Sequence, residues 1–60
     1  MAWLAVDKGG IECIYSAEPN KYNENDPMWQ TGGNFIYLPK GSIEKLTGKK
    51  LTWNDEPIKI

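Results

Sequence analysis

Histidine and arginine are both absent from this chain, and cysteine occurs once, as Cys13. Histidine is the side chain whose ordinary pKa suits a general base near pH 7, so its absence argues against most acid–base enzymes. A single cysteine without histidine makes neither a zinc site of the usual Cys/His kind nor a disulfide within the chain. Arginine is the usual bidentate reader of phosphates and guanine edges. We therefore do not expect a nucleic acid as a partner.

Long apolar runs and catalytic motifs are missing as well. No stretch approaches the 18 or more apolar residues that span a bilayer, and Met1 leads directly into a short apolar run without the cationic region of a signal peptide. We therefore expect a cytoplasmic protein without a membrane partner. Lys40-Gly41-Ser42 lacks the upstream glycine of a phosphate-binding loop. The sequence predicts no enzyme, no cofactor and no metal site.

Aromatic residues are what this short chain has in quantity. The 60 residues predict one domain, 1–60, with a marginal core. Each aromatic side chain buries roughly 150–250 Å², and oligomerisation is another common way for small chains to gain stability. We therefore expect a homo-oligomer. The aromatic residues are Trp3, Trp29, Trp53, Tyr15, Tyr22, Tyr37 and Phe35.

The hydrophobic pattern predicts an α+β fold with a small antiparallel sheet of three to four strands. Two extended runs flank Asp7-Lys8-Gly9-Gly10, which is typical of a β-hairpin over residues 2–16. A third strand is expected at 34–38 and a C-terminal strand at 58–60. On the second hairpin strand, the side chains expected in the core are those of Ile11, Cys13 and Tyr15, while Ile14 hints that part of the opposite face is also covered.

One short helix is expected at about 42–47. Gly41 is an acceptable N-cap with Glu44 reaching back to it, and Ser42 is the alternative cap. Gly48 suits the left-handed position after the last turn. The side chains expected on the buried helix face are those of Ile43, Leu46 and Thr47.

The long loop 18–33 carries almost no apolar periodicity. Connections longer than about 12–15 residues are uncommon unless they are functional or disordered. Tyr22 and Trp29 lie there among side-chain amides, a composition that binding surfaces use for contact area and directional hydrogen bonds. The alternative is that Trp29 folds back as a lid over the core. Both interpretations remain open from the sequence.

The helix start beside Lys40 is a second candidate, because free N–H groups at a helix N-terminus attract anions. The alternative there is an ordinary capped helix next to an exposed lysine. Together the two regions supply the candidate ligand- or partner-binding residues, which are Tyr22, Trp29, Gln30, Asn34, Lys40 and Ser42.

The stretch LPKGSIEKLTGKKLTW at 38–53, continuing through Glu56-Pro57, carries a resemblance. It resembles the C-terminal part of small uncharacterised proteins encoded by phages and mobile elements of gut bacteria. The resemblance implies an accessory protein and assigns no activity to particular residues.

We therefore expect a small non-enzymatic binding protein, a phage or mobile-element accessory. It would occupy a host protein or sequester a small anionic ligand through its 18–33 loop. The alternative is a structural or assembly subunit whose aromatic residues serve self-association only.

Overall fold

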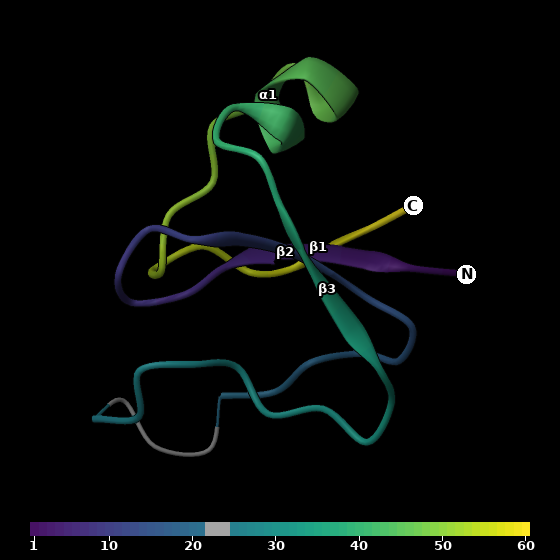
Figure 1. Cartoon of the computed structure of the whole chain (residues 1–60), viewed down its shortest axis with the longest axis vertical. Coiled ribbons are helices and arrows are strands. Elements are labelled where there is room, and N and C mark those ends of the chain that lie inside the picture. The colour runs from purple at the N-terminus through teal and green to yellow at the C-terminus, as the bar shows by residue number, and fades with distance from the viewer. Residues whose placement is uncertain (22–24) are drawn as a thin grey trace.

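The structure, a computed structural model, describes residues 1–21 and 25–60. The described residues form a four-stranded antiparallel sheet with the strand order β3-β2-β1-β4 and one short helix (Figure 1). This confirms the predicted α+β class and the antiparallel sheet. Tyr22 lies outside the described residues. The elements are β1 (Trp3–Val6), β2 (Glu12–Tyr15), β3 (Phe35–Leu38), α1 (Ser42–Thr47) and β4 (Ile58–Lys59).

The predicted N-terminal hairpin is confirmed, and the side chain of Asp7 fixes its turn. β1 pairs antiparallel with β2, with Trp3 opposite Tyr15. Oδ1 of Asp7 accepts hydrogen bonds from the backbone N–H groups of Gly9 and Ile11, each at 2.9 Å. Gly10 has φ 89°, a left-handed conformation that favours glycine. The aspartate and the glycine together close the chain between the two strands.

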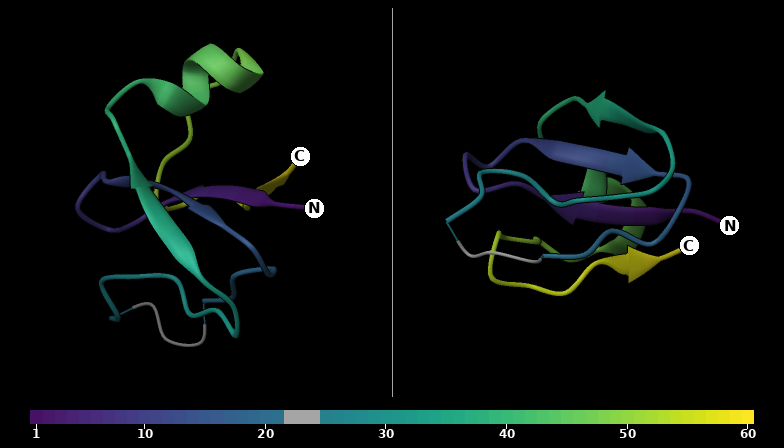
Figure 2. Two further views of the ribbon diagram at one scale, coloured as in Figure 1. Left: turned by 45° about the vertical axis from the view of Figure 1, so that its right-hand side comes forward. Right: turned by 90° about the horizontal axis from the view of Figure 1, so that it is seen from below.

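The two outer strands extend the hairpin on either side. β3 pairs with β2 and begins at Phe35, one residue later than expected, while β4 pairs with β1. The backbones of Ala2 and Ile60 exchange hydrogen bonds of 3.3 and 2.8 Å just beyond β4. β3 and β4 are therefore the two edges of the sheet, and the right-hand view of Figure 2 shows the four strands side by side.

Each face of the sheet has its own buried cluster. On one face Trp29, from the 18–33 segment, packs with Ala5, Cys13 and Tyr15. On the other face Ile43, from α1, packs with Leu4 and Val6. Figure 1 shows the sheet lying between the helix and the described part of the 18–33 segment, so the described residues form three layers. This arrangement explains the apolar run in β1, whose alternate side chains enter opposite clusters.

Two expected core positions are exposed. Ile11 is 48% exposed, because it precedes β2 at the end of the sheet where the hairpin turns. On α1 only Ile43 is fully buried, and Leu46 is largely exposed. The helix therefore attaches to the sheet mainly through its first turn.

Candidate functional site

Trp29 is part of the core, with 7% of its surface exposed. Its indole Nε1–H donates a hydrogen bond of 2.9 Å to the carbonyl oxygen of Val6. The pairing of β4 with β1 stops at Leu4 and Ile58, so β4 does not reach this carbonyl. Buried carbonyl groups need a donor, and the indole supplies it. In this structure Trp29 acts as the lid of the aromatic cluster.

Lys21 places its ammonium group against two tryptophan rings. Its Nζ lies 4.8 Å from the ring centroid of Trp29 and 3.9 Å from that of Trp53. The same nitrogen donates to the backbone carbonyl of Trp53 at 2.5 Å. The two rings meet edge to face, 5.5 Å apart. The two tryptophan rings are thus already engaged by a cation of the same chain. Lys21 and Trp53 lie 32 positions apart, so no local sequence signal indicates this contact.

The start of α1 is already occupied by a carboxylate from the sheet. Oε2 of Glu12 accepts from the N–H of Gly41 at 2.6 Å, and Oε1 accepts from the N–H of Ile43 at 2.7 Å. A capping box would need the Glu44 carboxylate to accept from the Gly41 N–H, but that N–H donates to Glu12 and no side-chain cap bond is made within the helix. The expected capping box with Glu44 is therefore wrong. The Ser42 hydroxyl donates to the Pro39 carbonyl at 2.6 Å instead of capping the helix.

The predicted site residues that the structure describes do not gather in one place. Gln30 is exposed, and its backbone pairs with that of Asn20 in an isolated bridge. Asn34 is exposed just before β3, where its N–H donates to the Ser16 hydroxyl at 2.9 Å. Lys40 follows the other end of β3, and Ser42 is the first residue of α1. A small ligand bound beside Gln30 and Asn34, before β3, would not contact Lys40 and Ser42, which follow it.

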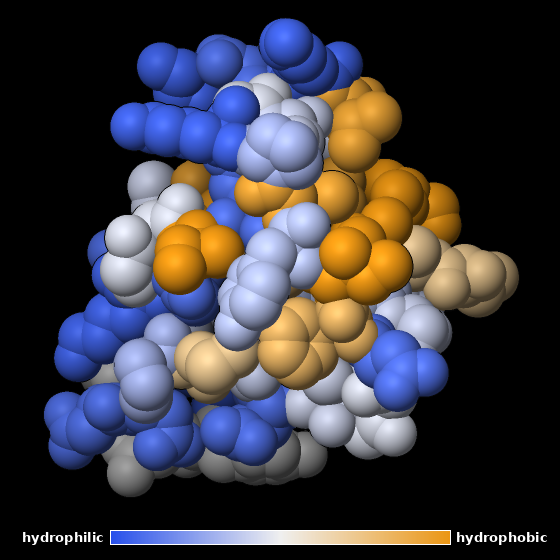
Figure 3. All heavy atoms as spheres, viewed as in Figure 1, coloured by the Kyte–Doolittle hydropathy of each residue, from blue (hydrophilic) through white to orange (hydrophobic). Residues whose placement is uncertain are grey.

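The surface that the sequence did not single out is strand β3 itself. Phe35 is 39% exposed, Ile36 is 68% exposed and Tyr37 is 57% exposed. Figure 3 shows hydrophobic side chains gathered across the middle of this face, with hydrophilic ones above and below. We call Phe35, Ile36 and Tyr37 the β3 edge. Such a patch on a sheet edge is a site that proteins normally protect from contact with other chains.

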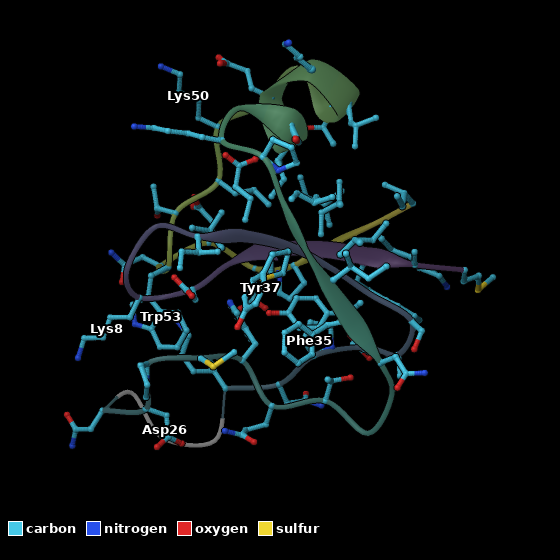
Figure 4. The ribbon with its side chains drawn as sticks, viewed as in Figure 1. Lys8, Asp26, Phe35, Tyr37, Lys50 and Trp53 are labelled. Carbon is cyan, nitrogen blue, oxygen red and sulfur yellow. The ribbon has the colours of Figure 1, made fainter. Side chains whose placement is uncertain are left out.

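The two aromatic rings of the β3 edge lie on the same side of the sheet. Figure 4 shows them one above the other beside the strand. The ring of Phe35 lies 5.5 Å from that of Tyr37 and 5.8 Å from that of Tyr15, which is buried. The Phe35 ring therefore rests on a buried neighbour and the Tyr37 ring rests on Phe35, while part of each ring remains available to a partner.

The backbone of the β3 edge also has groups that face away from the sheet. Ser16 N donates to Asn34 O at 2.9 Å, which marks a hydrogen-bonded pair of the β2–β3 ladder. In an antiparallel ladder such pairs alternate, so Ile36 and Leu38 bond to β2. The N–H and C=O groups of Phe35 and Tyr37 then point outward. Among the described residues no strand lies beyond β3.

A hollow of about 620 Å³ lies between the hairpin turn, the helix start and residues 50–54. Figure 4 labels Lys8, Lys50 and Trp53 around it. Its lining includes three lysines but also the carboxylates of Asp7, Glu12 and Glu44. Because the charges balance, the hollow has no evident preference for an anion.

Cys13 and Tyr15 are buried side by side in the aromatic cluster. Burial raises the pKa of the Cys13 thiol and that of the Tyr15 hydroxyl. The Tyr15 hydroxyl makes no hydrogen bond of ordinary geometry with a described residue. The neighbouring Cys13 thiol is only a weak hydrogen-bonding group. Both groups are thus held neutral, which makes Cys13 a packing residue and not a nucleophile.

Two kinds of feature are absent from the residues that the structure describes. Within these residues no group of three or more His, Cys, Asp or Glu side chains is placed to hold a metal ion. None of their helices is both long and apolar enough to cross a membrane. Comparisons with protein-family models, with curated proteins and with solved structures found no match to this chain.

Proposed function

We propose that this protein is a non-enzymatic binding module that engages a partner protein by pairing a strand of the partner with the β3 edge. The observation that carries the proposal is the outward-facing backbone of Phe35 and Tyr37, flanked by exposed apolar side chains. In this mode of recognition the main-chain hydrogen bonds supply affinity, and side chains alternating along the strand supply specificity.

The proposal moves the recognition surface from the 18–33 loop to the strand that follows it. Trp29 and Lys21 are engaged within the chain, which weakens the case for an aromatic ligand platform on the loop. The helix start is engaged by Glu12, which favours a partner protein over a small anionic ligand. Asn34 remains beside the proposed surface. The role of phage or mobile-element accessory stays a prediction that rests on the resemblance at 38–57.

The second candidate is a structural or assembly subunit, and the same strand favours it. Exposed apolar side chains on a sheet edge suit self-association as well as a foreign partner. The two candidates differ in whether a protein of another sequence binds this edge.

Capture from cells that produce the protein tests the proposal, with wild-type, Ile36→Lys and Ile60→Lys baits. Ile60 is the matched control, because it is 53% exposed just beyond β4, at the opposite edge of the sheet. We expect a partner that wild type and Ile60→Lys retain and Ile36→Lys loses. A partner retained equally by all three baits would show that binding lies elsewhere.

A further inference from the structure

We infer that the β3 edge binds a second copy of this chain, with the two β3 strands antiparallel across a two-fold axis at Ile36. The inference rests on the proposed function, because it assigns an occupant to the same edge. The result would be one continuous sheet through both copies. A two-fold contact of this kind uses the same surface on each subunit.

The backbone selects the register. Outward N–H and C=O groups are found at Phe35 and Tyr37, as the β2–β3 ladder requires. The ladder is limited on one side by Pro39, which has no N–H. On the other side it is limited by Gly33, whose N–H already donates to the Thr31 hydroxyl at 3.2 Å. Placing Phe35 opposite Tyr37 of the second copy satisfies every outward group of both residues in both copies. With the axis at Phe35, Tyr37 would face Gly33, whose N–H is already engaged, so the Tyr37 carbonyl would have no donor. With the axis at Tyr37, Phe35 would face Pro39, and the Phe35 carbonyl would have no donor.

The side chains complement themselves in this register. On the face of the aromatic cluster, each Phe35 meets Tyr37 of the second copy, so that four rings gather over the two buried Tyr15 rings. On the other face the two Ile36 side chains meet at a non-hydrogen-bonded position, where opposite Cα atoms lie about 4.5 Å apart. Aromatic and β-branched pairs are the cross-strand contacts that stabilise antiparallel sheets.

Charge does not oppose this pairing. Residues 34–38 carry no ionisable acid or base other than the Tyr37 phenol. The first charged residue past the strand is Lys40, which the register places opposite Gly32 of the second copy. Two neutral, identical strands therefore meet without like charges facing each other.

The available area sets the strength of the contact. Taking about 200 Å² for a whole aromatic side chain, Phe35 and Tyr37 together offer roughly 190 Å². With Ile36 this remains well below the roughly 800 Å² per partner of a standard interface. We therefore expect a reversible dimer that forms with rising concentration and leaves the edge open to a competing protein strand.

Sedimentation equilibrium from low micromolar to millimolar concentration tests the inference. We expect wild type and Ile60→Lys to gain mass with concentration and Ile36→Lys to stay monomeric, because two lysines would face each other at the axis. Tyr37→Pro and Tyr37→Ala both remove the ring, but only the proline removes the outward N–H. The proline variant should therefore dimerise more weakly than the alanine variant.

Cysteine cross-linking tests the register. Under an oxidised glutathione buffer, Ile36→Cys should form a disulfide dimer much faster than Phe35→Cys, because only residue 36 faces itself. Native Cys13 is buried and does not compete. A wild-type chain that stays monomeric at millimolar concentration would refute the second copy as occupant, and equal cross-linking of the two variants would refute the register. Partner capture that ignores Ile36→Lys would instead refute the proposed function, so the two failures are distinguishable.

Discussion

Glu12→Gln should destabilise the fold by an amount that can be worked out from two hydrogen bonds. The Glu12 carboxylate accepts from Gly41 N at 2.6 Å and from Ile43 N at 2.7 Å, which ties α1 to strand β2. Glutamine keeps one oxygen and turns an NH₂ group toward the other N–H, so one bond is lost and two donors face each other. A hydrogen bond to a charged group contributes about 1.5–3 kcal/mol. We expect a loss of about 2–3 kcal/mol.

This loss is large for so small a protein. Domains have about 0.05–0.15 kcal/mol of stability per residue, which makes Glu12→Gln a substantial fraction of the total. At about 4–8 °C per kcal/mol for small domains, Tm should fall by roughly 10–20 °C.

Thermal and urea unfolding, followed by tryptophan fluorescence and far-ultraviolet circular dichroism, measure the effect. Glu44→Gln is the matched control, because Glu44 is exposed in the first turn of the same helix. It should change stability by less than about 0.5 kcal/mol, as surface substitutions usually do. A Glu12→Gln protein as stable as Glu44→Gln would refute the carboxylate cap.

Three further predictions concern the aromatic face of the sheet. Trp29→Phe removes the donor to the buried Val6 carbonyl and should cost about 1–3 kcal/mol in urea unfolding; unchanged stability would contradict the lid role. Lys21→Gln removes the cation from the rings of Trp29 and Trp53 and should cost about 1–2 kcal/mol, with a changed tryptophan emission; an unaltered spectrum and stability would contradict the contact. Burial raises the pKa of the Cys13 thiol from its ordinary 9.0, so above that pH the unfolded chain loses a proton that the folded chain keeps. Stability should therefore be unaffected by this group below pH 9.0 and decline above it, by up to about 1.4 kcal/mol per pH unit. Urea titrations of wild type and Cys13→Ala should show a shallower decline in the variant, and equal slopes would contradict it.

Local signals were sufficient to predict the elements of this fold. The hairpin followed from the Asp7–Gly10 turn between two extended runs, and α1 was expected at 42–47, where the structure has it. Gly48 takes the predicted left-handed conformation, with φ 77°. These features depend on residues close in sequence, which is why turn and cap chemistry identified them.

The features that decide function depend on contacts distant in sequence. The Glu12 cap joins residues 29 and 31 positions apart, and a helix start considered alone looks open to an anion. That β3 is an edge follows from the strand order, which alternation within residues 34–38 does not determine. Trp29 was ambiguous because an aromatic residue in a loop suits either a core or a surface. Its burial comes from packing on the aromatic cluster, and its indole N–H bonds to the carbonyl of Val6, 23 positions away, which β4 does not reach.

Residue-resolved amide hydrogen exchange, measured by NMR across a concentration series, tests most directly whether the β3 edge is a binding surface. In dilute protein the amides of Phe35 and Tyr37 should exchange quickly, while that of Ile36, bonded to β2, should exchange slowly. At millimolar concentration the Phe35 and Tyr37 amides should become protected, and Ile36→Lys should abolish that change. Two results would contradict the proposed surface. One is protection of the Phe35 and Tyr37 amides already in dilute protein. The other is equally fast exchange of these amides at every concentration and with a captured partner bound.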